Sequence, residues 1–452
     1  MELFNEQGWA KEEIDERLQV LWNMSKLDGR SEAMNLFEEG RHLVSCDSLP
    51  WGDEVRERVV QAYLQFIHGE MWATGDGARE MQGEITSMIG GLLGAANAEG
   101  RITTGGTESI LSAMACAKHR AYTRRFPGIE PGQRFSRPGA PVEPNKPFLE
   151  FERQSKSVVM PIHQHYSAFK ACALFGLEPV TVSPRTERVW EIDPDDVRAA
   201  IREDTVAIFA TAGVWPYGTI DPIREMGRIA EEFDLYFHVD ACFGGFVIPF
   251  LELAGYYDPP LDPWDFRVSA VSSISADLHK NAMVPPPCSL ILFRDESLLE
   301  MAKVISPPSG VMTGTRATGP VAAAWTMMRA LGLEGFKQMS LFTIGLRDGM
   351  MAGCQGIEGI EVSDASKMNL FAVYSRTIDL RPAIKALRAK GWTVSTKPTP
   401  PPVCLTLVTM PQNAGQVEAF VSDFEEAIRE NHVSLGSAPA DYDYSHYGGI
   451  PL

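Results

Sequence analysis

A regular alternation of apolar runs and helical patterns between residues 157 and 240 constrains the fold most. Short β-branched runs such as SVVMPI, TVAIFAT and LYFHV are separated by amphipathic segments such as SAFKACALFGL and PIREMGRIAEEF. Each apolar run is typical of a strand buried on both faces, and each amphipathic segment has the period of a helix. The pattern therefore predicts βαβ units and an α/β fold with a mainly parallel sheet covered by helices.

The chain has 452 residues, more than one ordinary hydrophobic core needs. We expect an N-terminal helical arm, a large cofactor-binding α/β domain and a small C-terminal α+β domain, at residues 1–70, 71–320 and 321–452. A Pro- and Gly-rich insert at 125–148 is typical of a surface loop. The last dozen residues lack periodicity, which leaves open a free tail or a contact with another subunit.

Composition excludes several classes of partner. The chain has 41 Lys and Arg against 59 Asp and Glu, a formal net charge of −18, and no block of five basic residues. Such a chain lacks the clustered positive charge that attracts nucleic acid or an anionic membrane. Gly, Glu or Arg interrupts the most apolar windows well before the roughly 20 residues that a membrane span needs. We expect a small-molecule partner, and neither nucleic acid nor a membrane.

The cysteines and the first residues indicate the compartment. The seven cysteines are an odd number, widely spread and without a CxxC pair, as is typical of reduced thiols. The opening MELFNEQGWAKEEIDERL is acidic and amphipathic, unlike a signal or transit peptide. Both features predict a cytoplasmic protein.

Two charged residues are expected at the edge of the sheet where ligands bind. Parallel sheets bind ligands outside the carboxyl ends of their strands. Asp240 ends the apolar run LYFHVD, and Lys280 follows the run of small residues SSISADLH. For either residue alone, a solvated surface charge is the alternative.

The segment ITTGGTESILSAMACAKHR is a candidate phosphate site. Gly105, Gly106 and Thr107 stand at the start of an amphipathic helix. Free N–H groups and the positive end of the helix dipole favour an anion at such a place. A plain turn with an N-cap stays open as the alternative.

His163 and His165 in PIHQHYSAFK allow two interpretations. As a pair they suggest a metal site, but no carboxylate or cysteine cluster at ligand spacing accompanies them, so we expect no metal. A single imidazole after a strand is suited instead to stack on a planar ligand, and we assign this role to His165.

Together these features fit one cofactor, pyridoxal 5'-phosphate. Its aldehyde needs an imine-forming amine, for which Lys280 is the candidate. Its ring nitrogen needs a carboxylate that keeps it protonated, for which Asp240 is the candidate. His279 would contact the phosphate. We expect a desolvated, cation-rich setting to lower the pKa of Lys280, because imine exchange needs a neutral amine.

Six segments occur in the order and spacing of a known family: TTGGTESI, HYSAFKACALFG, WPYGTIDPI, HVDACFGGF, SISADLHK and TGTR. From about residue 82 to 424 the chain resembles the group II pyridoxal-phosphate decarboxylases of fold type I, in their sphingosine-1-phosphate lyase-like branch. It also has features of the archaeal tyrosine and aspartate decarboxylases. The resemblance implies a large domain with a mainly parallel sheet and a smaller C-terminal α+β domain.

The resemblance implies roles for single residues. Lys280 forms the imine, Asp240 pairs with the ring nitrogen and His165 stacks on the ring. The other cofactor contacts that it implies are Gly105, Gly106, Thr107 and His279 at the phosphate, Cys242 behind the ring, and Thr211 at the end of the neighbouring strand.

The resemblance also implies a homodimer with shared active sites. In this family the segment that corresponds to Gly314, Thr315 and Arg316 approaches the phosphate of the other subunit. Gly314 and Thr315 are therefore expected to contact the cofactor of a partner chain, on analogy alone.

The chain departs from its relatives at positions that set the reaction. Asn281 and Pro286 stand where lyases of the sphingosine phosphate type have a Tyr and a second Lys. The loop VISPPSGVMTGTR lacks the Tyr that reprotonates the product in related decarboxylases. The stretch VCLTLVTMPQN lacks the usual Arg and His for the substrate carboxylate, which leaves Arg316, Arg376 or a partner residue as candidates.

We predict a pyridoxal-phosphate-dependent carbon–carbon lyase that acts on an amino acid or amino alcohol, with loss of CO2 preferred over retro-aldol cleavage of a non-phosphorylated substrate. The missing Tyr leaves open another fate of the carbanion, such as reaction with oxygen. An aminotransferase and a cofactor-binding protein without lyase activity stay open as alternatives.

Overall fold

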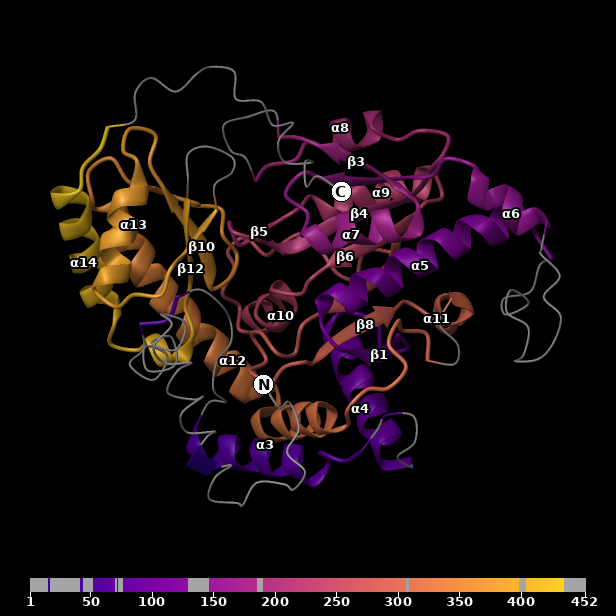
Figure 1. The fold of residues 1–452 in the computed structure, drawn as a ribbon, viewed down its shortest axis with the longest axis horizontal. Helices are drawn as coiled ribbons and strands as arrows, with labels where there is room; N and C mark the ends of the chain where they lie inside the picture. Colours follow the sequence, from indigo (N-terminus) through magenta and orange to yellow (C-terminus); the bar gives the residue numbers. More distant parts are fainter. Residues whose placement is uncertain are drawn as a thin grey trace, which may run out of the picture.

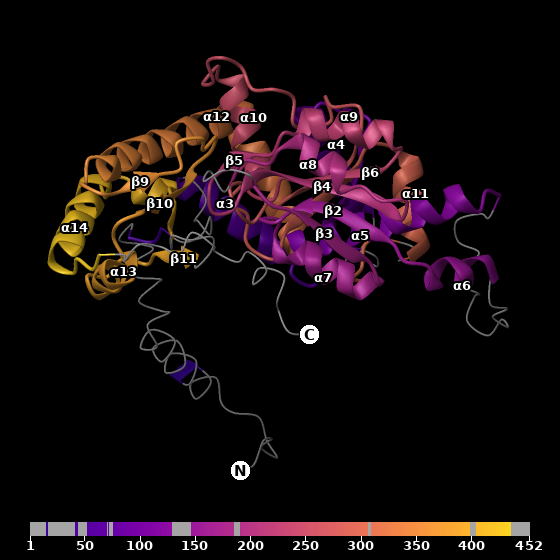
Figure 2. The ribbon, with the colours of Figure 1, turned by 90° about the horizontal axis from the view of Figure 1, so that it is seen from above.

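The computed structural model describes residues 15–16, 41–43, 52–69, 71, 76–128, 146–184, 190–305, 309–397 and 404–434 (Figure 1). Two sheets organise this part of the chain. Figures 1 and 2 show the smaller sheet beside the larger one, with the long helix α12 (Gly319–Gln355) running from the helices of the large part to the smaller sheet.

The larger sheet is mainly parallel. Its strands lie in the order β1-β8-β7-β6-β4-β2-β3, and the short β5 pairs with β4. The run β7-β6-β4-β2-β3 is parallel throughout, whereas β8 is antiparallel to both of its neighbours. The strands are β1 (Glu99–Thr103), β2 (Ser157–Pro161), β3 (Glu178–Val182), β4 (Thr205–Val214), β5 (Thr219–Ile220), β6 (Tyr236–Asp240), β7 (Val271–Ala276) and β8 (Ser289–Phe293).

Helices cover both faces of this sheet, because successive side chains of a buried strand point to opposite sides. Phe209 and Tyr236 pack in the cluster that includes α5, α7 and α11, whereas Ile208 and Phe237 pack in the cluster that includes α4, α9, α10 and α12. The helices of the large part are α3 (Asp53–Gln65), α4 (Asp76–Leu92), α5 (Gly106–Arg125), α6 (Lys146–Arg153), α7 (Tyr166–Phe175), α8 (Pro194–Ala199), α9 (Ile223–Glu232), η1 (Gly244–Phe246), α10 (Ile248–Leu253) and α11 (Glu296–Ile305).

The smaller sheet is antiparallel, in the order β11-β12-β10-β9. Its elements are β9 (Glu361–Val362), β10 (Leu370–Tyr374), α13 (Leu380–Ala389), β11 (Ser395–Lys397), β12 (Cys404–Val408), η2 (Pro411–Asn413) and α14 (Val417–Glu430). Helix α12 joins the two cores: Phe336 packs in the large core, and Met350 and Cys354 pack in the small one. Its backbone breaks at Gly332, whose φ of 59° glycine adopts without steric cost.

The predicted α/β architecture, with a mainly parallel sheet and a smaller mixed part, is confirmed. The domain boundaries at residues 70 and 320 stay predictions. Residues 129–145 of the predicted surface loop and the final segment 435–452 lie outside the described residues, while α6 begins at Lys146, inside the predicted loop. No helix in the described part of the chain is long and apolar enough to cross a membrane.

Candidate active site

The predicted site residues come from neighbouring strands that end at one edge of the large sheet. Asp240 is the last residue of β6, and its register partners are Thr211 on β4 and Ser275 on β7. His165 follows β2 and caps α7, and Lys280 follows β7. Parallel pairing brings these strand ends to the same side, as the sequence predicts.

One detail of this expectation is wrong. Thr211 does not end its strand, because β4 continues to Val214. Its parallel pairing with β6 does end at Thr211, and beyond it β4 pairs with β5. The Thr211 hydroxyl donates to Gln164 Oε1 at 3.0 Å, so Thr211 still lies at the edge beside the residues that follow β2.

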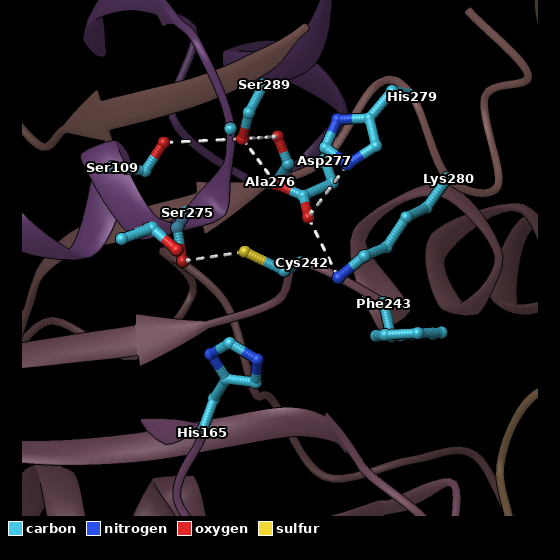
Figure 3. Close-up of polar contacts among 12 residues, drawn as sticks. Ser109, His165, Cys242, Phe243, Ser275, Ala276, Asp277, His279, Lys280 and Ser289 are labelled. Atoms are coloured by element: carbon cyan, nitrogen blue, oxygen red, sulfur yellow. Dashed lines mark hydrogen bonds and ion pairs between the residues drawn. The ribbon is translucent and has the colours of Figure 1, made fainter. Parts of the chain in front are cut away.

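Lys280 lies in an anionic setting, not the cation-rich one that the sequence suggested (Figure 3). Its Nζ is 2.9 Å from Asp277 Oδ2 and 3.9 Å from the centre of the Phe243 ring. Burial by itself lowers the pKa of Lys280, but the nearby carboxylates of Asp277 and Asp240 outweigh it, and the pKa is raised. The expectation of a lowered lysine pKa is therefore wrong for this arrangement.

Asp277 is a site residue to which sequence reasoning assigned no role. Its side chain is only 3 % exposed, and the Ser289 hydroxyl donates to its Oδ1. His279 Nδ1 donates to the carbonyl of Cys288 at 2.6 Å, which leaves Nε2 facing Asp277 Oδ2 at 3.8 Å. Burial raises the pKa of Asp277, but the adjacent Lys280 and His279 lower it overall. Asp277 is thus the shared neighbour of both basic residues.

A directed hydrogen-bond chain holds Asp240. Ser275 Oγ donates to Asp240 Oδ1 at 3.1 Å, so it accepts from His238 Nε2 at 3.3 Å. His238 Nδ1 then accepts from Ser273, which accepts from Tyr236. Burial lowers the pKa of His238 to about 4, which keeps the imidazole neutral at pH 7, as this chain requires.

The two oxygens of Asp240 have different surroundings. Oδ1 accepts from Ser275 and from the backbone N–H of Cys242 at 3.0 Å. Oδ2 has no hydrogen bond from any residue that the structure describes, although Asp240 is only 4 % exposed. A carboxylate oxygen left free to accept in a residue that is otherwise buried suits a charged donor, and the protonated ring nitrogen of pyridoxal phosphate is such a donor. This feature fits the predicted cofactor.

The start of α5 comes close to the same edge. A Cβ added at Gly106 would lie 2.6 Å from Cys242 Sγ and 2.9 Å from Asp277 Oδ1, so only glycine fits. Gly105 has a φ of 146°, which L side chains rarely adopt. The first N–H groups of a helix have no acceptor within it. The predicted phosphate cradle at Gly105, Gly106 and Thr107 therefore has suitable geometry.

His165 points from the start of α7 toward Cys242 and Lys280 (Figure 3). Its Nδ1 lies 2.8 Å from Ser167 Oγ and accepts from the Ser167 N–H, which fixes the ring. Ser167 Oγ in turn lies 2.8 Å from Thr107 Oγ1, on α5. Ser167 thus links His165, the candidate for stacking on the ring, to Thr107 in the candidate phosphate site.

The structure does not favour the alternative of a metal pair. His163 Nε2 is 2.8 Å from Asp221 Oδ1, and Asp221 Oδ2 accepts from the Thr211 N–H at 2.7 Å, so His163 is part of a buried polar contact. Across the described ranges, no group of three His, Cys, Asp or Glu residues is arranged to hold a metal ion.

Gly314 and Thr315 lie in a different place from Lys280. They line a cavity of about 940 Å³ together with Arg79, Arg101 and other residues of α4 and β1. The preceding Thr313 donates from N–H and hydroxyl to Glu108 Oε1 in the first turn of α5. The segment therefore contacts the first turn of α5, next to the candidate phosphate site, while Gly314 and Thr315 face the cavity.

The two arginine candidates for a substrate carboxylate have other partners. The guanidinium of Arg316 donates to the carbonyl of Ile102 on β1, and its burial lowers its pKa. Arg376 forms an ion pair with Glu361 on β9 at 3.1 Å. These partners belong to strands other than those that carry Asp240 and Lys280.

The chain is similar to known pyridoxal-phosphate enzymes over most of its length. The model of the pyridoxal-dependent decarboxylase conserved domain matches residues 145–372, a range that includes His165, Asp240 and Lys280. A probable L-tyrosine/L-aspartate decarboxylase of Methanothermobacter thermautotrophicus is 30 % identical over 81 % of this chain and 92 % of its own length. Sphingosine-1-phosphate lyase 1 of Rattus norvegicus is 28 % identical over 94 % of this chain and 69 % of its own.

A solved structure agrees with these matches. The sphingosine-1-phosphate lyase of Burkholderia pseudomallei superposes with a TM-score of 0.77 at 28 % identity, over 95 % of this chain and 93 % of that one. The predicted family, fold and cofactor are therefore confirmed. The chain belongs to the pyridoxal-dependent decarboxylase family and is a pyridoxal-phosphate-dependent carbon–carbon lyase.

Proposed function

We propose that the protein removes CO2 from an amino acid, with Lys280 as the residue that bonds the cofactor. The observation that carries this proposal is the meeting of Lys280, Asp240 and His165 at one sheet edge, beside the glycine start of α5. Bound pyridoxal phosphate supplies an electron sink for the charge left when a bond to the amino-acid carbon breaks. The residues of this chain bind the cofactor and orient it.

The side chains would divide this task. Asp240 Oδ2 would accept a hydrogen bond from the protonated ring nitrogen, while the hydrogen-bond chain from Tyr236 holds the carboxylate in place. His165 would lie against one face of the ring and Cys242 against the other. The residues around the start of α5, namely Gly105, Gly106, Thr107 and His279, would hold the phosphate, and Thr211 would contact the cofactor from β4.

Two features favour decarboxylation over cleavage of a phosphorylated long-chain substrate. Asn281 donates to the carbonyl of Phe243 at 2.8 Å and accepts from Asn369 at 2.9 Å, so it ties two loops together near Lys280. Pro286 offers no charge where a second lysine binds phosphate in related lyases. Several relatives bear the names of tyrosine and aspartate decarboxylases, which supports an amino-acid substrate.

Product analysis tests this proposal. We expect the cofactor-loaded protein, incubated with the common amino acids one at a time, to release CO2 and form the matching amine from at least one of them, as mass spectrometry detects. An aldehyde that forms in air and gives way to the amine under argon would indicate that the carbanion reacts with oxygen. Transfer of the amino group to a keto acid without CO2 would contradict the proposal and favour the aminotransferase alternative.

We also propose a homodimer in which each subunit completes the site of the other. Gly314 and Thr315 line a cavity that does not include Lys280, which is expected if they serve a partner's cofactor. The cavity also contains Arg79 and Arg101, which suit an anionic group.

Hybrid dimers test the shared site. We expect Lys280→Ala and Thr315→Glu each to abolish activity, because the first lacks the amine and the second places a carboxylate against the phosphate. Mixing the two variants with subunit exchange should restore about a quarter of the wild-type activity, since half of the dimers are hybrids with one intact site each. Hybrids that form but stay inactive would show that Thr315 serves its own subunit.

The remaining expectations complete the proposal. The partner is a small molecule, with neither nucleic acid nor a membrane involved, in keeping with the net charge of −18. A cytoplasmic location is supported by the six cysteines in the described part of the chain, which are all buried and form no disulfide. We keep the division into an arm, a large domain and a small domain at residues 70 and 320 as part of this proposal.

A further inference from the structure

The pair of Lys280 and Asp277 suggests a role for a carboxylate that the decarboxylation chemistry does not use. The two residues lie three apart in the chain, after β7, and their charged atoms are 2.9 Å apart. Lys280 is a lysine whose amine must be neutral to attack an aldehyde. In this arrangement the amine is instead held as an ammonium ion, because the carboxylate raises its pKa.

Asp277 is anchored by one serine hydroxyl and by the hydroxyl groups behind it. Ser289 on β8 donates to Oδ1, and Ser289 Oγ is 3.3 Å from Ser109 Oγ on α5. Ser109 Oγ lies 2.8 Å from Thr103 Oγ1 at the end of β1. Figure 3 shows Ser289 on the side of Asp277 away from Lys280. The carboxylate is therefore a fixed group rather than a mobile counter-ion.

The same carboxylate lies where the phosphate of the cofactor is expected. A Cβ on Gly106 would be 2.9 Å from Oδ1 and 3.1 Å from Oδ2, so the carboxylate packs directly on the first residue of α5. The positive end of a 20-residue helix stabilises a negative charge there. A phosphate dianion at that helix end and an ionised Asp277 beside it would repel each other.

The charged and titratable groups around Lys280 come from three strand ends. After β6 these are Asp240 and Cys242, after β7 they are Asp277 and His279, and after β2 it is His165, which points toward Lys280 (Figure 3). The short helix η1 is preceded by Phe243, whose ring face contacts the ammonium without a charge. Of the two carboxylates, Asp277 is the one in direct contact, and Asp240 acts on Lys280 from farther away.

We propose that Asp277 is a positioning residue that holds Lys280 as an ammonium ion in the cofactor-free enzyme and takes its proton when pyridoxal phosphate enters. The proposal rests on the role of Lys280 in the proposed function. The ammonium gives one proton to Asp277 Oδ2; the neutral amine then adds to the aldehyde carbon, a carbon–nitrogen double bond forms, and the aldehyde oxygen leaves as water. The carboxyl of Asp277 is then neutral and able to donate a hydrogen bond to the phosphate.

Chemical labelling of the full-length, cofactor-free protein tests this assignment without any measurement of activity. An amine-reactive acylating reagent is applied across a pH series, and mass spectrometry measures the labelled fraction of the Lys280 peptide. We expect half-labelling of Lys280 at a higher pH than that of the exposed lysines in the same digest. In Asp277→Asn the half-labelling pH of Lys280 should fall by at least about one unit.

Two variants serve as controls. Asp277→Glu keeps the charge and should keep the wild-type labelling profile. Asp265→Asn removes a buried carboxylate that accepts from the Arg267 N–H and guanidinium at 2.9 and 2.7 Å and is not among the groups that shift the pKa of Lys280, so it should leave Lys280 unchanged. Identical profiles in wild type and a folded Asp277→Asn would overturn the proposal. If Asp277→Asn does not fold, the wild-type profile alone tests the proposal. A half-labelling pH of Lys280 that is lower than that of the exposed lysines would overturn the proposal.

The rate of cofactor uptake gives a second readout, followed by the visible absorbance of the protein-bound cofactor. The wild-type rate should change little with pH near neutral pH, since Lys280 passes its proton to Asp277 inside the site. The rate of Asp277→Asn should rise by about tenfold per pH unit, because its ammonium group must first lose the proton to solvent. If the half-labelling pH of Lys280 falls in Asp277→Asn but the cofactor never bonds to Lys280, the proposed function is wrong. The ion pair between Lys280 and Asp277 is then still supported. If the cofactor bonds to Lys280 with no dependence on Asp277, only the role of Asp277 fails.

Discussion

Replacing Lys280 with alanine is expected to lower the rate of product formation by at least about a thousandfold. Asp240, His165, Cys242 and Asp277, the other described side chains at this edge of the sheet, carry no amine. The variant should also lose covalent attachment of the cofactor, measured as borohydride-trapped peptide. Its stability should change less than its activity. The loss of Lys280 leaves Asp277 with the Ser289 hydroxyl and His279 as neighbours, at a cost of about 1–3 kcal/mol.

A second lysine offers a matched control. Lys337 pairs with Glu334 at 3.0 Å and with the same three-residue spacing as Lys280 and Asp277, but on an exposed stretch of α12. Lys337→Ala should leave turnover unchanged and alter stability by no more than about 0.5 kcal/mol. Trapping of the cofactor on another lysine in the Lys280→Ala protein, with turnover retained, would contradict the assignment of Lys280.

The architecture could be predicted from the sequence because its signal is periodic. Runs such as TVAIFAT and LYFHV are short, mostly apolar and rich in β-branched and aromatic residues, as is typical of a strand covered on both faces, and both proved to be central strands. The positions of Asp240 and Lys280 followed from one further rule, that ligands bind at the carboxyl ends of parallel strands. His165 was found on the same grounds, since it lies between the end of β2 at Pro161 and the start of α7.

The environment of these residues depends on strand register, which the sequence does not reveal. The register of β6 and β7 shifts between Phe237 and His238, and this shift places His238 opposite Ser273 and Asp240 opposite Ser275. The hydrogen-bond chain to Asp240 could therefore be suspected from the alternate polar residues of both strands, but its pairing could not be derived.

The pKa direction of Lys280 was missed for a related reason. The sequence places Asp277 three residues before Lys280 but does not fix how the backbone turns between them after β7. The structure brings the two charges to 2.9 Å, and the carboxylates of Asp277 and Asp240 together outweigh the effect of burial on the pKa of Lys280. The role of Gly314 and Thr315 was likewise beyond the reach of one chain, because a shared site depends on a second copy.

Asp240→Asn is expected to lower the turnover rate by about 10²- to 10³-fold while the protein stays folded and binds the cofactor. The amide oxygen can still accept from Ser275 Oγ and from the Cys242 N–H, which are 3.1 and 3.0 Å from Oδ1, so the loop after β6 should keep its shape. The change falls on Oδ2, where a neutral NH2 group replaces a carboxylate oxygen. The ring nitrogen then loses the negative charge that keeps it protonated.

The measurement that separates this effect from general damage compares two buried aspartates. Asp265→Asn removes the ion pair with Arg267 away from the sheet edge and should lower the melting temperature while turnover by the folded, cofactor-loaded protein stays within about twofold of wild type. Asp240→Asn should show the reverse, with a small change in melting temperature, normal cofactor content and a large loss of turnover. Full turnover in Asp240→Asn would mean that the ring nitrogen does not need this carboxylate, and the electron-sink role assigned to the end of β6 would have to be abandoned.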